Sequence, residues 1–337
     1  MSFEKVTVVI PCRNEIDYIS SFIESLENQD YPRDLMELIL VDGMSDDGTR
    51  QYLESISCKG TLVLDNPEQQ VSAGLNLAIK RATGNIIVRM DVHCVFPVDY
   101  ISALVTYLLN TPKAGNVGVP CETLASDDGL LAASIALVLS TPIGVGDSSF
   151  RVESPIEPKS VDTVPFGCWR RSIFELIGNF DTDLVRNQDD EFNQRVLKAG
   201  FEVHLLPGPK VTYFGRSDLV SHIKMFYQYG LFKPLVNRKT GKLTTLRQLA
   251  PGTLVLVLLI NLLLSFVLPG ISIISGVTCL TAYLVLAPFF LSSYSGSKAL
   301  IYIPFVCCLI LTHLSYGIGY LKGLVVGLSD KGVSLSR

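Results

Sequence analysis

The sequence has little charge, no zinc-type arrangement of cysteines and neither of the common glycine motifs for phosphate binding. Only 18% of its 337 residues are charged and 48% are hydrophobic, a balance too apolar for an ordinary soluble enzyme and far too apolar for a disordered chain. Its eight cysteines form no C-x-x-C pair and no cluster with histidine, which argues against structural zinc and a disulfide framework. Neither G-x-G-x-x-G after the first apolar run nor G-x-x-x-x-G-K-[ST] occurs, so a bound nucleotide needs other ligands.

Charge is absent altogether from one long segment in the last third of the chain. No charged residue lies between Pro251 and Ser297, and the positions after Ala250 hold four basic residues and one acidic residue. Of the 28 basic and 32 acidic residues in the chain, 24 and 31 therefore lie in positions 1–250. A net acidic globular part argues against binding nucleic acid through phosphate contacts. We predict a globular part followed by a membrane-embedded tail, with no nucleic-acid partner.

The uncharged segment is long enough for more than one membrane span. A helix needs about 20 residues to cross a bilayer, and the segment fits two such helices, near Thr253–Leu268 and Ile271–Leu291, joined by a Pro-Gly turn. A third uncharged stretch covers Ala299–Leu321. We therefore predict a membrane domain at 251–337 with two to three transmembrane helices, in a multi-pass protein of the cytoplasmic membrane.

The segment before the first span, 219–250, is basic. It has six basic residues and no acidic one, and four aromatic residues are interleaved with the lysines between positions 224 and 233. By the positive-inside rule this segment stays in the cytoplasm, together with the domain that precedes it at 1–218. We predict a basic amphipathic segment at the cytoplasmic leaflet of the membrane. A solvated linker is the alternative.

Short β-branched runs alternate with helix-like patterns in the first 90 residues. Strand, helix and strand at this spacing predict right-handed βαβ units and a parallel sheet. In open sheets of this kind, ligands bind beyond the carboxyl ends of the strands. The strands are expected at Val6–Ile10, Leu38–Val41, Leu62–Leu64 and Ile86–Met90, with helices over 19–26 and Ala73–Arg81.

Acidic residues stand after two of these strands, at the edge where a ligand is expected. Asp42 follows the second strand, and Asp91 follows the fourth, with His93 two residues later. One carboxylate at such an edge can accept hydrogen bonds from a base or ribose, and another can coordinate a divalent cation that neutralises a diphosphate. Asp42 suits the first task, and Asp91 with His93 suits the second. The alternatives are an Asx turn at Asp42 and a solvated turn at Asp91.

The polar motifs resemble those of a known enzyme family in kind and in order. They are Pro11-x-x-Asn14-Glu15, Val41-Asp42-x-x-Ser45-x-Asp47-Gly48-Thr49, Asn76, Ala82-x-Gly84, Arg89-x-Asp91-x-His93 and Gln188-Asp189-Asp190-Glu191. Over roughly positions 5–235 the chain resembles glycosyltransferase family 2, the inverting GT-A enzymes, and especially the membrane-anchored bacterial enzymes of the succinoglycan glucosyltransferase type. The resemblance implies an α/β fold of the GT-A type, with a Rossmann-like, mostly parallel sheet and flanking helices, followed by the C-terminal transmembrane helices.

The resemblance also implies roles for individual residues on the donor side. Asp42 is expected at the base, and Asp91 at the diphosphate. Asp91 and His93 are the implied ligands of a divalent cation, either Mg²⁺ or, since imidazole is a softer ligand than carboxylate, Mn²⁺. The residues expected to bind the nucleotide are Pro11, Asn14, Glu15, Asp42 and Asp91.

On the acceptor side, the family's Glu-Asp pair falls on Gln188-Asp189, which makes Asp189 the implied catalytic base. Its neighbour Asp190 is a candidate for the acceptor site, although these acids also suit the first turn of a helix. Trp169, the single tryptophan, either stacks on an acceptor sugar or fills core space. Gln228 belongs to a further motif of the same subgroup and is the third acceptor-site candidate. The Gln-x-x-Arg-Trp pattern of processive relatives is missing around it, which favours transfer of one sugar per encounter.

These observations predict a membrane-bound inverting glycosyltransferase. It would move a sugar from a nucleotide-sugar, with a UDP-sugar expected, to a lipid-linked saccharide in exopolysaccharide or cell-surface glycan synthesis. A transferase that charges polyprenyl phosphate is the nearer alternative, because an ionised acceptor needs no base. A non-catalytic membrane protein that only binds nucleotide-sugar is the alternative of another class. The hypothesis requires the carboxylates of Asp42, Asp91 and Asp189 to gather around one cleft.

Overall fold

The computed structural model describes residues 3–56, 61–291 and 294–326, and the chain forms two compact units. The first unit consists of Met1–Glu122 and Glu153–Tyr213, and the second of Thr123–Val152 and Phe214–Arg337. The chain therefore passes between the units three times. The last part of the predicted membrane domain, residues 327–337, lies outside the described residues.

Four parallel strands form one half of the main sheet of the first unit, in the order β3-β2-β1-β4. These strands confirm the ones that the β-branched runs in the sequence predicted. Cys12 pairs with Asp42, and Asp42 with Asp65, so three neighbouring strands end level with one another. The strands are β1 (Val6–Cys12), β2 (Met36–Asp42), β3 (Thr61–Asp65) and β4 (Ile86–Arg89).

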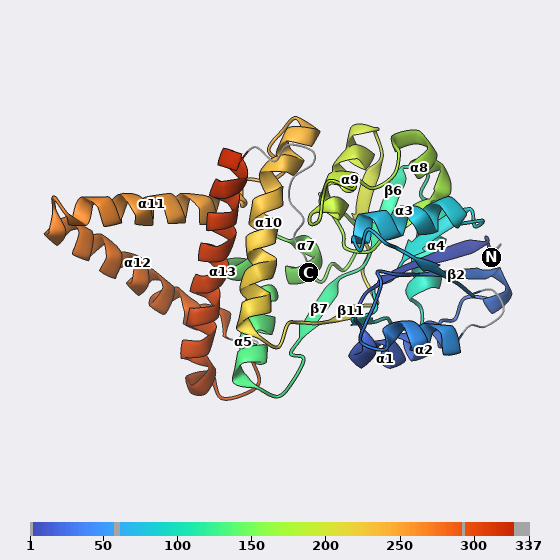
Figure 1. Cartoon of the computed structure of the whole chain (residues 1–337), viewed down its shortest axis with the longest axis horizontal. Coiled ribbons are helices and arrows are strands. Elements are labelled where there is room, and N and C mark those ends of the chain that lie inside the picture. Colours follow the sequence, from blue (N-terminus) through green and yellow to red (C-terminus); the bar gives the residue numbers. More distant parts are fainter. Residues whose placement is uncertain (1–2, 57–60, 292–293, 327–337) are drawn as a thin grey trace. The chain divides into compact units, whose positions relative to one another are not determined.

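The direction of travel across the sheet reverses after β3. The chain moves from β1 to β2 to β3 and then returns past β1 to β4. Right-handed crossovers place α1 (Ile16–Glu27) and α2 (Thr49–Ser55) on one face and α3 (Val71–Arg81) on the other (Figure 1). In open α/β sheets such a reversal marks the ligand site, beyond the carboxyl ends of the strands that flank it. In this chain those strands are β1 and β4.

Beyond β4 the sheet is mixed. β9 (Cys168–Arg170) runs antiparallel to β4 and to β6 (Ala114–Gly118), and β10 (Glu202–Leu205) is parallel to β6. The edge strand β8 (Lys159–Ser160) is antiparallel to β10. A second sheet has the order β5-β11-β7. Its strands are β5 (Cys94–Val95), β11 (Val211–Phe214) and β7 (Cys121–Leu124), and the other helices of the first unit are η1 (Arg33–Leu35), α4 (Tyr100–Asn110), α8 (Arg171–Ile177) and α9 (Gln188–Lys198).

The second unit is built mainly of helices, and it includes a segment that the sequence analysis assigned to the domain at 1–218. Residues 123–152 belong to this unit, because α5 is apolar around its whole circumference and packs against α13. A helix without a polar face needs partners on all sides. The helices are α5 (Leu130–Leu139), α6 (Pro142–Val145), α7 (Ser149–Val152), α10 (Leu219–Thr240), α11 (Leu249–Ser265), α12 (Pro269–Phe290) and α13 (Lys298–Val326).

Helices α10 and α13 run side by side (Figure 1) and touch through glycines. A Cβ atom on Gly319 would lie 2.2 Å from the carbonyl oxygen of Tyr227, and one on Gly230 would lie 2.0 Å from that of Tyr316. Small residues that let two backbones approach this closely are typical of helix packing in membranes. Glycine at these positions therefore sets the distance between the two helices.

The segment 219–250 differs from the surface segment expected at the membrane leaflet. The side chains of Phe226 and Phe232, two of the four aromatic residues of this segment, are buried, and so is Lys233. Four of the six basic residues of the segment remain exposed, namely Lys224, Arg238, Lys239 and Lys242. The local pattern could not show this burial, because the partner helix α13 begins almost 60 residues after α10 ends.

Two helices, α12 and α13, are long and apolar enough to cross a membrane. Most of α12 is exposed, whereas α13 is partly covered by α5, α10 and α11. The third apolar helix, α11, has 17 residues, fewer than the roughly 20 that a span requires. These helices support membrane association. The number of spans and the side on which the first unit lies stay predictions.

We predict that Gly319→Ala destabilises the second unit and that Gly270→Ala does not. The added methyl group at position 319 would force α10 and α13 apart, and overpacking of this kind costs about 1–3 kcal/mol. Gly270 has open space around it, and alanine is the better helix former by about 1 kcal/mol. Helical circular dichroism during heating in detergent micelles measures both effects. Equal melting temperatures for the two variants would contradict glycine-mediated packing.

Candidate functional site

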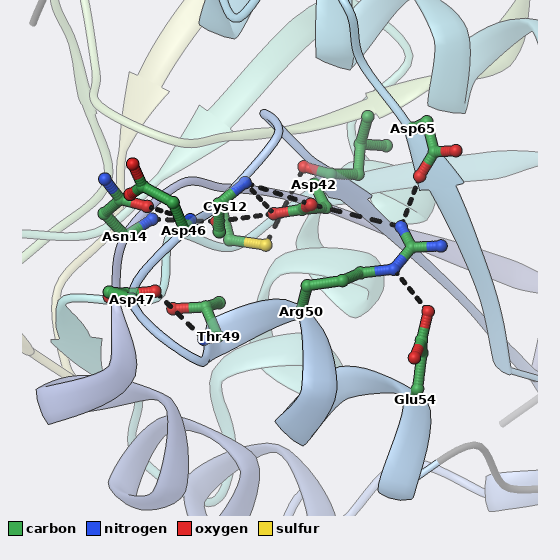
Figure 2. A network of polar contacts seen from close by, with 11 residues as sticks. Cys12, Asn14, Asp42, Asp46, Asp47, Thr49, Arg50, Glu54 and Asp65 are labelled. Carbon is green, nitrogen blue, oxygen red and sulfur yellow. Dashed lines mark hydrogen bonds and ion pairs between the residues drawn. The ribbon is translucent and has the colours of Figure 1, made fainter.

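The loops that follow β1 and β2 are joined by hydrogen bonds around Asn14 (Figure 2). Its backbone N–H donates to Oγ of Ser45 (2.9 Å), and its Oδ1 accepts from the backbone N–H of Asp46 (3.0 Å). Asn14 has a φ of +55°, a left-handed conformation that asparagine adopts more readily than most residues. The three residues of the first predicted motif, Pro11, Asn14 and Glu15, therefore stand at the end of β1 beside the loop after Asp42.

Asp42 lies at the end of β2 and is almost wholly buried. Its carboxylate accepts from the backbone N–H of Ser45 at 3.2 and 3.3 Å and from the Ser45 hydroxyl at 2.5 Å. Arg50 approaches it to 4.0 Å and also pairs with Glu54 and Asp65 (Figure 2). Asp42 thus stabilises the turn after β2, as the Asx-turn alternative expects. A carboxylate offers about four acceptor positions, so these bonds leave capacity for a ligand.

A single arginine brings Asp91 and Asp189 together. Arg89 at the end of β4 donates from Nε and Nη2 to the two carboxylate oxygens of Asp91, at 2.8 and 2.9 Å. Its Nη1 donates to Oδ1 of Asp189 in the first turn of α9. The guanidinium side chain is 4% exposed, while 14% of Asp91 and 27% of Asp189 remain exposed. The two carboxylates assigned to diphosphate and base are therefore held by one buried cation.

The environment of Asp189 suits a base that works near neutral pH. Burial raises the pKa of its carboxyl to about 6, although the neighbouring Arg89 lowers it, and the negative charges of Asp91 and Asp190 raise it further. Arg89 has its own pKa raised, because the two carboxylates outweigh the effect of its burial. A pKa close to the working pH is what general base catalysis requires.

His93 has one ring nitrogen occupied and the other available. Its Nδ1 lies 3.3 Å from Oε1 of Glu15, and its ring packs edge-on against Tyr213 at a centroid distance of 5.4 Å. Histidines that bind metals usually donate their second ring N–H to a carboxylate in this way. The arrangement leaves Nε2 of His93 as a ligand atom.

The donor set fits a divalent cation that arrives with its substrate. Among the described residues, no group of three or more histidine, cysteine, aspartate or glutamate side chains is placed to hold a metal ion. Mg²⁺ and similar cations at phosphate sites commonly use one or two protein ligands and take the others from phosphate and water. Asp91 and His93 offer ligand atoms of the type required, although Arg89 already uses one lone pair on each oxygen of Asp91.

Buried amide side chains hold α9 against the sheet. Asn193 on α9 is 1% exposed, accepts from Nδ2 of Asn116 on β6 (2.7 Å) and donates to Oγ1 of Thr163 (2.8 Å). The Oδ1 atom of Asn116 in turn accepts from the backbone N–H of Cys168 on β9 (3.2 Å). Buried amides that satisfy one another fix a unique arrangement, because any shift leaves polar atoms unpaired. This network sets the position of Asp189.

The loop that leads into α9 is clamped by Asn76, a residue of the predicted motif set on α3. Its Nδ2 donates to the backbone carbonyl oxygen of Phe180 (2.8 Å), and its Oδ1 accepts from the backbone N–H of the same residue (3.0 Å). The side-chain amide thus makes the same pair of hydrogen bonds to Phe180 that a backbone partner would make in a β-sheet. Asn76 therefore supports the loop before α9, the helix that carries Asp189.

Trp169 is a core residue. Its side chain is 2% exposed and packs edge-on against Phe174, Phe180 and Phe192 at centroid distances of 5.7–6.1 Å. Stacking on an acceptor sugar was left open by the sequence and is wrong, because the aromatic cluster covers the indole ring.

The other two acceptor-site candidates have different outcomes. Gln228 is 2% exposed within α10 of the second unit, so this structure does not present it to an acceptor, and its role at the acceptor site stays a prediction. Asp190 stands beside Asp189 in the first turn of α9 and is partly exposed. Its role at the acceptor site stays a prediction.

No role was predicted for Arg89 from the sequence, where it is only one position of the motif Arg89-x-Asp91-x-His93. A signal was present, because this arginine stands in the otherwise apolar run Ile86–Met90. An arginine in a buried strand must be paired with acids, and Asp91 is the nearest one along the chain. Asp189, 100 positions away, could not be identified as the second partner from spacing.

Comparison with known proteins connects this arrangement to an enzyme family. Residues 7–127 match the family model described as Glycosyl transferase family 2. The chain is 28% identical to dolichyl N-acetyl-α-D-glucosaminyl phosphate 3-β-D-2,3-diacetamido-2,3-dideoxy-β-D-glucuronosyltransferase of Methanococcus voltae, over 96% of this chain and 98% of that protein. It is also 28% identical to succinoglycan biosynthesis protein ExoA of Rhizobium meliloti, over 72% of this chain and 73% of that protein.

A solved structure shows the same fold. A mannosyltransferase from Pyrobaculum calidifontis, in complex with GDP-mannose and Mn²⁺, superposes with a TM-score of 0.58 and 20% identity, over 95% of this chain and 87% of that chain. The likeness confirms the predicted α/β fold of the GT-A type.

We predict that Asn76→Asp destabilises the first unit. A carboxylate at this position faces the carbonyl oxygen of Phe180 without a donor, and a buried acceptor left unpaired costs about 1–3 kcal/mol. The same change at the exposed Asn28 should alter stability by less than about 0.5 kcal/mol. Trp169, the only tryptophan, packs against Phe180, so its fluorescence during denaturant unfolding reports on this region. Equal midpoints for both variants would show that the clamp contributes nothing.

Proposed function

We propose that this chain, whose residues 7–127 match the model of glycosyl transferase family 2, transfers a sugar with inversion from a nucleotide-sugar, in particular a UDP-sugar, to a hydroxyl group of a lipid-linked saccharide. The observation that carries the proposal is the pairing of Asp91 and Asp189 through Arg89. Arg89 connects Asp91, which we assign to the diphosphate, with Asp189, which we assign as the base. Burial raises the pKa of the Asp189 carboxyl to about 6.

In the proposed reaction the acceptor hydroxyl attacks the anomeric carbon of the donor sugar from the face opposite the diphosphate. The new carbon–oxygen bond forms as the bond to the diphosphate oxygen breaks, so the anomeric configuration inverts. Asp189 takes the hydroxyl proton. Its Oδ1 is bound to Arg89, whereas Oδ2 has no partner among the described residues and is the oxygen we assign to the proton.

On the donor side we assign Asp91 and His93 to a divalent cation, with Mn²⁺ preferred because of the imidazole ligand. When bound, such a cation stabilises the negative charge on the leaving diphosphate. The contact of Glu15 with Nδ1 of His93 would fix the direction of the ring and leave Nε2 for the cation. This role adds to the lining of the nucleotide pocket that we assign to Pro11, Asn14 and Glu15.

Asp42 is the residue we assign to the base of the nucleotide. The bonds from Ser45 and the nearby guanidinium of Arg50 (4.0 Å) fix the direction of the carboxylate. A fixed acceptor suits recognition of a base N–H group, because little conformational entropy is lost on binding.

The relatives support a lipid-linked acceptor and a membrane location. The Methanococcus voltae relative is named for a dolichyl-linked saccharide phosphate, and the Rhizobium meliloti relative for succinoglycan. The helices α12 and α13 would keep this chain at the membrane, where such acceptors are found. We propose a multi-pass protein of the cytoplasmic membrane with the first unit in the cytoplasm, where nucleotide-sugars are made, in exopolysaccharide or cell-surface glycan synthesis.

The test is a donor screen with the purified full-length chain in detergent. We expect nucleotide release from one of a panel of UDP- and GDP-sugars, with Mn²⁺, only when a membrane-lipid extract supplies an acceptor. Asp189→Asn should lower kcat by about 10²–10⁴-fold, the usual contribution of a general base, while the exposed Asp34→Asn should leave it unchanged. Binding of UDP without transfer to any acceptor would favour a non-catalytic binding protein.

The same variant separates the proposed reaction from the charging of polyprenyl phosphate. A phosphate oxygen is already ionised and needs no base, so Asp189→Asn would then keep most of its activity. We expect loss of activity, with a saccharide–lipid product in the wild type. Full activity of the variant on polyprenyl phosphate would overturn the assignment of a hydroxyl acceptor.

We predict that kcat/KM rises with pH and is half-maximal near pH 6. Only the ionised carboxylate accepts a proton, and the pKa of Asp189 is raised to about 6, chiefly by the partial burial of its carboxyl group. The contribution of this group to stability has the opposite sign. Since its pKa in the folded protein exceeds the ordinary 3.8, that contribution falls as pH rises between these two values. A rate profile that is flat from about pH 5 to 8 would contradict Asp189 as the base.

A further inference from the structure

Arg89 ends β4 and is held rigidly. Its backbone N–H donates to the carbonyl oxygen of Gly167 (3.0 Å), and its own carbonyl oxygen accepts from the hydroxyl of Tyr100 (3.4 Å). The guanidinium carbon lies 5.9 Å from the centroid of the Phe166 ring. With 4% of its side chain exposed, Arg89 is a fixed cation and not a mobile surface charge.

The peptide that supports Arg89 is conformationally unusual. Phe166 has a φ of +59° and Gly167 a φ of +106°, and positive φ is uncommon for a bulky residue. A Cβ atom at Gly167 would lie 2.4 Å from Oδ1 of Asn116, the buried amide that also anchors α9. Strain of this kind persists only where surrounding contacts impose it, and it clusters at functional sites. The same amide network therefore fixes both Asp189 and the support of Arg89.

We propose that Arg89 is a positioning residue of the transfer reaction, which holds Asp91 on the donor side and Asp189 on the acceptor side in one fixed geometry. This inference rests on the function proposed above. Arg89 touches neither the attacking oxygen nor the anomeric carbon. It acts through Asp189, by binding Oδ1 so that the second oxygen points to the acceptor hydroxyl, and through Asp91, by fixing where the diphosphate lies relative to the base.

The charges around Arg89 explain why a guanidinium is required. Asp91 takes two of its nitrogens and Asp189 the third, and Asp190 adds a further negative charge beside Asp189. Lysine keeps the positive charge but has no planar fork, so it cannot hold two carboxylates in these directions. A displacement of about 1 Å in a catalytic group can cost about 10²-fold in rate.

The experiment is a double-mutant cycle with Arg89→Lys, Asp189→Asn and the two changes combined, in the full-length chain with the donor found by the screen. We expect Arg89→Lys to lower kcat by about 10²-fold in the wild type and by less than about threefold in the Asp189→Asn background, since the base it aligns is gone. Binding of UDP with Mn²⁺, measured by calorimetry, should weaken by less than about tenfold.

A matched control is available on the neighbouring strand. Arg170 on β9 donates to the backbone carbonyl oxygens of Ala114, Leu108 and Thr111, so Arg170→Lys removes a guanidinium without touching the site. Its kcat should stay within about threefold of the wild type, whatever the loss of stability. An equal loss of kcat in Arg170→Lys and Arg89→Lys would reduce Arg89 to a structural residue and overturn the proposal.

The remaining outcomes separate this inference from the proposed function. If the wild type is active and Arg89→Lys lowers kcat by the same factor with and without Asp189→Asn, the positioning role alone is overturned. A wild type that transfers no sugar to any acceptor overturns both. If Arg89→Lys does not fold, as Trp169 fluorescence reveals, Phe166→Leu replaces it in the cycle. Loss of the ring under the guanidinium should lower kcat by about threefold to tenfold, again only when Asp189 is present.

Discussion

The buried ion pairs of Arg89 are the interaction on which the candidate site depends. Removing charged groups from water costs several kcal/mol per ion unless each is paired, and a guanidinium with five donors can pair with two carboxylates at once. The positive charge of Arg89 therefore offsets the repulsion between the carboxylates of Asp91 and Asp189, which can lie close together. Loss of the guanidinium would leave two partly buried carboxylates next to each other without a counter-charge, so the positions of Asp91 and Asp189 depend on each other.

Asp189 can reach Arg89 only because polar contacts hold α9 in place, and these contacts have no direct part in the chemistry. The paired amides of Asn116 and Asn193 attach the helix to the sheet, and Asn76 clamps the loop before it. Each of these side chains satisfies backbone or amide groups that burial would otherwise leave unpaired. The position of Asp189, the base in the proposed reaction, is thus set by hydrogen-bond satisfaction in the core, while its pKa is set by burial and by the charges next to it.

The second unit is under a different constraint, because its helices have too little polar surface to be exposed to water. Glycines on α10 and α13 let the two backbones touch, and α5 packs into the same group of helices. A lysine and two aromatic residues that a surface helix would expose are buried there instead. Close packing between α10 and α13 and the exposed apolar surface of α12 are both suited to a lipid environment, in which association depends on packing rather than on hydrophobic burial.

Local patterns in the sequence determined the parallel strands, the apolar C-terminal helices and the acids at the strand ends. These features depend on short β-branched runs that alternate with helix-like patterns, on the length of uncharged runs and on the short distance between a strand and the residue after it. Only the tertiary structure decided that Trp169 is covered by three phenylalanines, that α10 is buried under α13, and that Arg89 reaches Asp189. Each of these contacts joins segments whose separation along the chain carries no periodic signal. They exist because buried apolar surface and buried charge must both find partners in three dimensions.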